Sequence, residues 1–183
     1  DGAEGFPVVR IAPVPPQIIP KGIATPSLLA QVFTSKFVDA MPFYRQTKLF
    51  ARLGVDIPRH TMSGWAMAVA KALALFLALF REEIRSGPAV NMDETTLQVL
   101  KELGRSNTSL SYLWLFRGGN PERPTVVFVY DPSRSGSVPK TFLGDFKGYI
   151  QTDGYTGYQA IGESDGIIHV GCMAHIRRKF MDV

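Results

Sequence analysis

The chain has 183 residues, and 20 Lys+Arg against 16 Asp+Glu give it a formal net charge of +4. Hydrophobic residues make up 45% of it, which is typical of a folded globular protein and excludes a disordered or collagen-like chain. A single cysteine can form neither an internal disulfide nor a cysteine-rich zinc site. This excludes a disulfide-stabilised secreted scaffold and favours a reducing cytoplasm.

The charge is unevenly distributed along the chain. Residues 1–88 contain ten Lys+Arg and six Asp+Glu, whereas residues 89–183 contain ten of each. The whole positive excess therefore lies in the first half, which suits a segment that meets phosphates but equally fits a solvated surface. The chain begins at Asp1 and stops at Val183 within a helical pattern, so we expect a fragment.

The first part of the chain is predicted to be a linker followed by helices. Residues 5–20 include five prolines, which favours an extended connector over residues 1–24. Thr25 is a plausible N-cap, with Pro26 at the first helical position, for a helix reaching about Asp39. A second helix is predicted from Phe43 to about Leu53, closed by Gly54 at the C′ position.

A long apolar helix is expected next, capped by Thr61 or Ser63 and keeping helical spacing to Arg85. Its most apolar run, residues 66–80, is fifteen residues long and contains Lys71, which is too short for a bilayer span. We therefore expect no membrane association and a helix that is buried in a core or shared between subunits.

The segment from Gln46 to Trp65 has the order of a helix-turn-helix, although a plain helical hairpin fits the pattern equally well. Residues 36–60 carry five Lys+Arg against Asp39 and Asp56, which favours DNA contact. We therefore predict residues 25–87 to be a helical DNA-binding segment. Its candidate DNA contacts are Arg45, Lys48, Arg52, Arg59, His60, Thr61 and Ser63.

After Ser86-Gly87-Pro88 the periodicity changes from helical to strand-like, so a new domain is predicted for residues 88–183. Two hairpin signals, at 104–107 and 118–121, predict three antiparallel strands. A helix from about Pro139 to Phe146 predicts a crossover and parallel addition of the fourth strand. The expected fold class is α/β, a mixed sheet with strands at residues 89–99, 111–117, 125–130, 149–152 and 167–171.

Two acids are placed where they could hold a cation. Asp93 lies within an apolar strand, where an unpaired carboxylate is costly, and Asp153 stands at a strand end before Gly154. If the fourth strand pairs beside the first, the two carboxylates lie on adjacent strands and a divalent-metal site becomes plausible. A turn aspartate and an exposed strand end explain the same residues without a metal.

The last segment offers two further candidate sites. His169, Cys172 and His175 have the spacing of zinc ligands, but His169 belongs to a strand and no fourth ligand is near, so Cys172 reads better as a small residue at a strand end. The cluster Arg177, Arg178 and Lys179 fits either a solvated helix face or a phosphate contact.

Seven segments together closely resemble the transposases of the insertion sequence 66 family, over about residues 15–183. They are IPKGIATPSLLAQVFTSKFVD, PFYRQTKLFARLGVDIPRHTMSGW, MDETTLQVL, YLWLFRGG, ERPTVVFVYDPSRSG, FLGDFKGYIQTDGYTGY and VGCMAHIRRKF. The resemblance implies an RNase H-like catalytic core with an Asp-Asp-Glu triad. Its first two acids fall on Asp93 and Asp153.

The resemblance also implies that parts of the transposase lie outside this chain. The family's glutamate is on a helix beyond Val183, and its zinc-binding module precedes Asp1. Glu94 is a poor substitute because it points to the face opposite Asp93, and Glu163 lies in a Gly-rich loop. We therefore expect a fragment that is inactive alone.

The activity implied is metal-dependent cleavage and strand transfer at transposon ends, with two Mg²⁺ or Mn²⁺ ions held by the complete triad. The implied partners are transposon-end and target DNA and a second copy of the transposase, and the implied location is the bacterial cytoplasm, at the nucleoid. Two other functions remain open: a non-catalytic helix-turn-helix DNA-binding protein and an RNase H-like nuclease.

Overall fold

The computed structural model describes residue 12 and residues 15–181. The chain divides into two compact units, Asp1–Ala74 and Leu75–Val183, which we call the helical unit and the sheet unit. Most of the proline-rich segment lies outside the described residues. Of its described part, Ile19 and Ala24 pack against the helical core.

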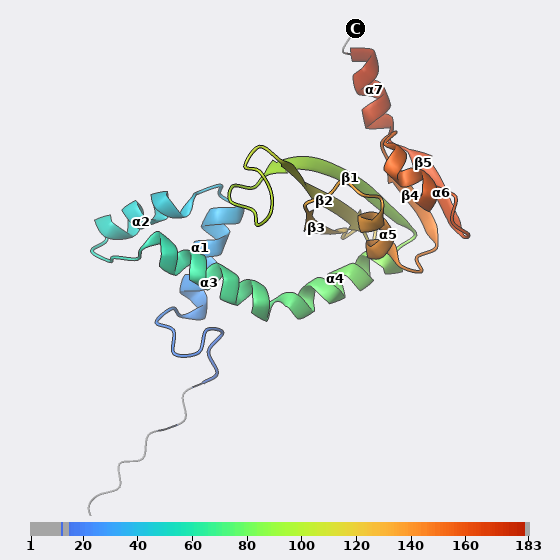
Figure 1. The fold of residues 1–183 in the computed structure, drawn as a ribbon. Helices are drawn as coiled ribbons and strands as arrows, with labels where there is room; N and C mark the ends of the chain where they lie inside the picture. The colour runs from blue at the N-terminus through green and yellow to red at the C-terminus, as the bar shows by residue number, and fades with distance from the viewer. Residues whose placement is uncertain (1–11, 13–14, 182–183) are drawn as a thin grey trace, which may run out of the picture. The chain divides into compact units, whose positions relative to one another are not determined.

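The helical unit contains α1 (Pro26–Phe37), α2 (Phe43–Arg52) and α3 (Arg59–Ala72), labelled in Figure 1. One small core joins them, because each helix turns apolar side chains toward the others. Its buried members are Ala24, Leu29, Val32, Ile57, Met62 and Trp65.

Local signals fix the ends of the first two helices. The Thr25 hydroxyl accepts a hydrogen bond from the Leu28 N–H at 3.2 Å, which confirms the predicted N-cap, and α1 ends at Phe37. Gly54 follows the C-cap of α2 with φ +78°, a left-handed conformation that glycine adopts without a Cβ penalty. The predicted C′ glycine is confirmed.

The predicted start of the long apolar helix is wrong. Helix α3 begins at Arg59, Pro58 is its N-cap, and no side chain supplies a capping hydrogen bond. The start is earlier because Ile57 and Met62 both enter the core, and Pro58 already has the φ that a helix needs.

The predicted helix is also not continuous. Leu73 leaves the helical conformation, and the chain resumes as α4 (Ala74–Ser86). Among residues 12 and 15–181, no single helix is long and apolar enough to cross a membrane; only α3 and α4 taken together reach the required length and composition.

The sheet unit is built on five strands in the order β3-β2-β1-β4-β5. Strands β1, β2 and β3 pair antiparallel, and β4 and β5 add in parallel. The elements are β1 (Ala89–Gln98), β2 (Leu110–Gly118), β3 (Thr125–Asp131), α5 (Ser137–Leu143), β4 (Gly148–Thr152), a 3₁₀ turn η1 (Thr156–Tyr158), α6 (Gln159–Gly162), β5 (Ile167–Gly171) and α7 (Met173–Met181).

This sheet confirms the predicted RNase H-like fold class. Both hairpins form where the glycine signals indicated, and β4 pairs beside β1 after the α5 crossover. No strand boundary differs from the predicted one by more than one residue, and α5 begins two residues and ends three residues earlier than expected.

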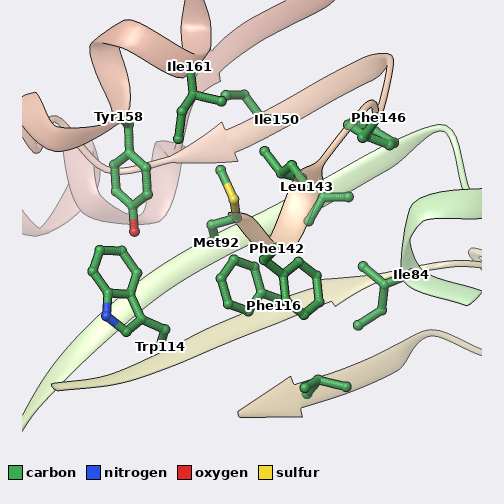
Figure 2. Close-up of a cluster of buried hydrophobic side chains, with 12 residues drawn as sticks. Ile84, Met92, Trp114, Phe116, Phe142, Leu143, Phe146, Ile150, Tyr158 and Ile161 are labelled. Atoms are coloured by element: carbon green, nitrogen blue, oxygen red, sulfur yellow. The ribbon is translucent and has the colours of Figure 1, made fainter. Parts of the chain in front are cut away.

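One face of the sheet carries the larger core, drawn in Figure 2. The rings of Phe116 and Phe142 stack with their centroids 3.7 Å apart, and Trp114 meets Tyr158 edge to face. Helix α4 contributes Ile84 to this core, so it packs with the sheet. Alternate strand residues such as Val90 and Met92 point into this core, which leaves the residues between them for the other face.

Candidate active site and DNA-contacting residues

The register of β1 against β4 relates the positions of the two candidate acids. The pairs Ala89–Tyr149, Val90–Ile150 and Asn91–Gln151 are all sixty residues apart. Continued two positions further, the same register sets Asp93 opposite Asp153. The strands are parallel, so Asp153 directly follows the carboxyl end of β4, where open α/β sheets bind ligands, and Asp93 lies within β1 just beyond its pairing with β4.

Side-chain contacts support this placement. The amide of Asn91 donates to Gln151 Oε1 at 2.5 Å, so the face that carries Asn91 on β1 also carries Gln151 on β4. Asp93 follows two residues later on β1, and Asp153 follows two residues after Gln151, just past the end of β4. Burial raises the pKa of the Tyr158 hydroxyl first and the Glu94 carboxylate second, and Asp93 and Asp153 add smaller contributions in the same direction.

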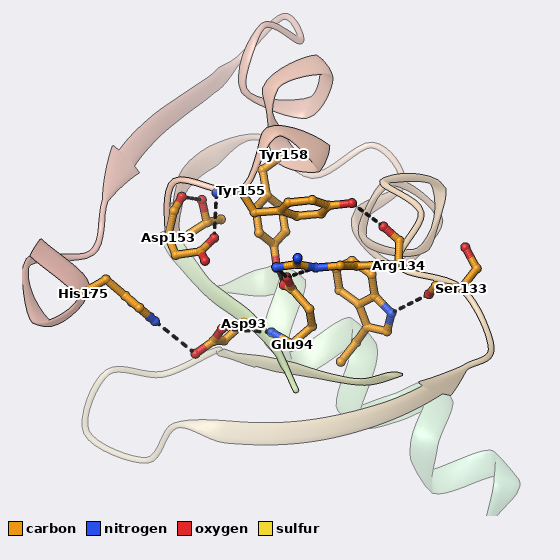
Figure 3. A network of polar contacts seen from close by, with 10 residues as sticks. Asp93, Glu94, Ser133, Arg134, Asp153, Tyr155, Tyr158 and His175 are labelled. Atoms are coloured by element: carbon orange, nitrogen blue, oxygen red, sulfur yellow. Dashed lines mark hydrogen bonds and ion pairs between the residues drawn. The ribbon is translucent and has the colours of Figure 1, made fainter. Parts of the chain in front are cut away.

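Each aspartate keeps one carboxylate oxygen engaged locally. Asp93 Oδ1 accepts from the Glu94 N–H, and Asp153 Oδ1 accepts from the Tyr155 N–H, both at 2.9 Å. Asp93 Oδ2 lies 3.7 Å from His175 Nε2 (Figure 3), and the Asp93 side chain is about half exposed, at 49%. These backbone bonds fix the direction of each carboxylate.

Glu94 lies on the core face, as the sequence predicted. Its side chain is only 2% exposed, and it accepts two hydrogen bonds from the guanidinium of Arg134, at 2.6 and 2.8 Å, and one from the Tyr158 hydroxyl. Glu163 is exposed directly after α6. Neither glutamate therefore supplies a third carboxylate beside Asp93 and Asp153.

The three residues with zinc-like spacing do not form one group. His169, on β5, is bonded through Nε2 to the Thr152 hydroxyl at 2.7 Å. His175, on α7, faces Asp93 and lowers the pKa of the Cys172 thiol by hydrogen bonding. Within residues 12 and 15–181, no group of three or more His, Cys, Asp or Glu side chains is arranged to hold a metal ion.

Most of the candidate DNA-contacting residues of the helical unit line two surface hollows. Arg45, Lys48 and Arg52 line one hollow on α2, which they share with Asp39. Residues at the start of α3 line the other, together with side chains of α2. Its lining includes Arg59, His60 and Ser63, whereas Thr61 is half-buried.

The basic cluster near the end of the chain is fully solvent-facing. Arg177, Arg178 and Lys179 are exposed on α7, a helix without a buried residue among its described side chains. Their exposure is compatible with contacts to phosphates and equally with a solvated helix face.

The profile of the family described as "Transposase IS66 family" matches residues 21–183. The chain belongs to this family. The described part of its five-stranded sheet lies within the segment that this DDE transposase family profile matches.

Three curated relatives from Sinorhizobium fredii (strain NBRC 101917 / NGR234) match most of this transposase chain. The uncharacterized protein y4jD is 35% identical over 96% of the chain, y4qI is 32% identical over 92%, and y4hP is 25% identical over 93%. The chain spans 36%, 33% and 32% of their respective lengths, about a third in each case.

One solved structure is also similar to the transposase chain at low level. It is a chain of the cryoEM structure of a simian T-cell lymphotropic virus intasome in complex with PP2A regulatory subunit B56 gamma. The TM-score is 0.34 with 16% sequence identity, over 52% of this chain and 37% of that one.

The two aspartates of the transposase have the chemistry that a hard divalent cation requires. Carboxylate oxygens are the ligands that Mg²⁺ and Mn²⁺ prefer, and Oδ2 of each aspartate is not used in the backbone bonds described above. This chain contributes two carboxylates as donors, and two carboxylates fit part of a metal site.

The residues that contact Glu94, the neighbour of Asp93, or Asp153 itself were not identified from the sequence. No strong sequence pattern indicated Arg134, Tyr155 or Tyr158, because their contacts join segments that are distant in the sequence: the loop after β3 and the segment after β4. A weak signal was present, since Tyr155 stands two residues after Asp153, where an aspartate side chain bonds a backbone N–H.

Proposed function

We propose that this chain supplies the first two metal-binding carboxylates, Asp93 and Asp153, of an insertion-sequence transposase that cleaves and joins DNA at transposon ends. The observation that supports the proposal is the constant sixty-residue register between β1 and β4, which runs toward both acids in a chain that belongs to a family of DDE transposases.

Asp93 and Asp153 would hold the cations, two Mg²⁺ or Mn²⁺ ions in the complete site. Such ions, when bound, activate the attacking oxygen and stabilise the leaving oxygen of the phosphodiester. The chain's own contribution is orientation, because the Glu94 and Tyr155 N–H groups turn the two carboxylates before any ion binds. A third carboxylate would come from outside residues 1–183.

The exposed basic residues fit the DNA partner of this reaction. Arg45, Lys48 and Arg52 on α2 and Arg59 and His60 on α3 would contact the phosphates and base edges of transposon-end DNA. Thr61 and Ser63 belong to the same proposed contact region, and Arg177, Arg178 and Lys179 on α7 would contact phosphates near the acids. The protein would work on paired ends with a second copy, at the bacterial nucleoid.

The test is excision of a marked element by the full-length transposase containing this chain. Asp93→Asn and Asp153→Asn keep the side-chain size and remove the charge, so each should abolish excision. Asp165→Asn is the matched control, because Asp165 is 98% exposed and pairs with Lys147 away from the acids. Excision by either of the first two variants at the wild-type level would contradict the proposal and favour a non-catalytic DNA-binding protein.

A substrate panel separates transposition from general nuclease activity. The transposase should cut duplexes that carry the element's ends and leave RNA–DNA hybrids of the same sequence intact. Cleavage of the hybrids without end-specific DNA cleavage would instead favour an RNase H-like nuclease.

A further inference from the structure

The β1–β4 ladder ends before it reaches the two acids. Its last pair is Asn91–Gln151, and β4 itself ends at Thr152. Asp93 and Asp153 therefore stand two residues beyond the last paired position. Their separation must be set by other contacts, because backbone pairing no longer fixes it.

Arg134 contacts both acid-bearing segments. Its guanidinium donates two hydrogen bonds to Glu94, the neighbour of Asp93, and lies 3.8 Å from the centroid of the Tyr155 ring. The Tyr155 hydroxyl in turn donates to the Arg134 carbonyl at 2.6 Å, and the Tyr155 N–H binds Asp153. Figure 3 shows this chain of contacts running from one acid segment to the other.

The loop that carries Arg134 is itself anchored. The indole of Trp114, fully buried on β2, donates to the Ser133 carbonyl at 3.4 Å. Further along the loop, a Cβ on Gly136 would come within 2.3 Å of the Gly157 carbonyl oxygen, so only glycine allows this approach. Arg134 is thus held against the segment that follows Asp153.

We propose that Arg134 is a positioning residue that fixes the spacing of Asp93 and Asp153 for metal binding. It acts through Glu94 on one side and Tyr155 on the other, and it does not touch the metal. Glu94 is the required counterpart, because a buried carboxylate gives the guanidinium a fixed geometry through two hydrogen bonds. The inference rests on the proposed function of the two aspartates.

The experiment measures Mn²⁺ binding to the 183-residue chain by electron paramagnetic resonance, with thermal unfolding followed by circular dichroism. Arg134→Ala should weaken Mn²⁺ affinity by about tenfold or more, the usual effect of losing an outer partner of metal ligands. Arg123→Ala is the matched control, since Arg123 is exposed in the loop between β2 and β3. It removes the same charge and should leave the affinity unchanged.

A double variant separates positioning from stability. Arg134→Ala leaves the Glu94 carboxylate buried without its cation, which lowers the melting temperature. Adding Glu94→Gln removes that unpaired charge and should restore the melting temperature, but it cannot restore the contact with Tyr155. Mn²⁺ affinity should therefore stay weak in the double variant. Recovery of both properties would show a merely structural role and overturn the inference.

Arg134→Lys keeps the test decisive if the alanine variant does not fold. Lysine retains the charge but loses the planar two-nitrogen contact, so Mn²⁺ affinity should fall between the wild-type and alanine levels. Wild-type affinity in the lysine variant, or in a folded Arg134→Ala chain, would refute the positioning role.

Asp93→Asn identifies which proposal has failed. If this variant loses Mn²⁺ binding while Arg134→Ala retains it, only the role of Arg134 is wrong. If Asp93→Asn binds Mn²⁺ as the wild-type chain does, the proposed function itself is wrong and the inference falls with it.

Discussion

The helical unit and the sheet unit place their candidate functional residues in opposite ways. On α2 and α3 the basic residues are exposed on helices whose ends are set by nearby signals such as Thr25 and Gly54. In the sheet unit, Asp93 and Asp153 are related only through two strands, sixty residues apart, that pair in one register. The first arrangement depends on local sequence and the second on the whole fold.

The two cores also differ in how much of the chain forms them. The helical core is formed by six buried residues from a short stretch of chain, whereas the sheet core joins twelve from α4 to α6. A substitution in the sheet core should therefore change the positions of Asp93 and Asp153 as well as lower stability. The basic surface of α2 and α3 should tolerate substitutions that leave these helices folded.

The largest expected effect is on the sheet core. Phe116→Ala removes a fully buried ring stacked on Phe142, and it should lower the free energy of unfolding by about 3–5 kcal/mol. Urea unfolding measures it. Phe128→Ala is the control: Phe128 is 59% exposed on β3, so its loss should change stability by less than about 0.5 kcal/mol. Equal effects of the two variants would contradict the assignment of the core face.

The next effect probes the helical core. Gln46 is 1% exposed, and its amide donates to the carbonyls of Val32 and Met41 at 3.1 and 3.0 Å. Gln46→Ala should cost about 1–3 kcal/mol, because it removes two hydrogen bonds between helical segments and leaves a gap at a buried position. Lys48→Ala, on the exposed side of the same helix, is the control. If both variants unfold at the wild-type urea concentration, Gln46 does not tie α1 to α2.

Most of the sheet could be predicted from the sequence, because glycine hairpin signals and alternating apolar residues are local. The parallel addition of β4 could be predicted from the crossover helix, whereas its place beside β1 was only a condition in the sequence analysis, and the structure shows it. The partners of Glu94 could not be predicted, since Arg134 and Tyr158 reach it across forty and sixty-four residues. The break at Leu73 was missed because the apolar spacing continues through it.

The third prediction tests the basic surface by itself. Arg59→Ala should weaken binding to transposon-end DNA and reduce the slope of log affinity against log salt by about one, the loss of one phosphate contact. Fluorescence anisotropy at several salt concentrations measures both. Lys71→Ala, at the far end of α3, should leave the slope unchanged. An unchanged slope for Arg59→Ala would mean that the start of α3 is scaffold.

The smallest effect reports the packing of α7 near the acids. His175 lowers the pKa of the Cys172 thiol, so in the folded chain the thiolate forms at a lower pH than in the urea-unfolded chain. Because the thiolate is the reactive species, iodoacetamide should alkylate this single cysteine faster in the folded chain at pH values below the ordinary thiol pKa. His175→Ala should move the alkylation profile back toward higher pH, whereas His169→Ala, whose ring is bonded to Thr152, should not. If His175→Ala leaves the alkylation profile unchanged, α7 does not hold this imidazole between Cys172 and Asp93. The contact of α7 with the acid site would then be refuted.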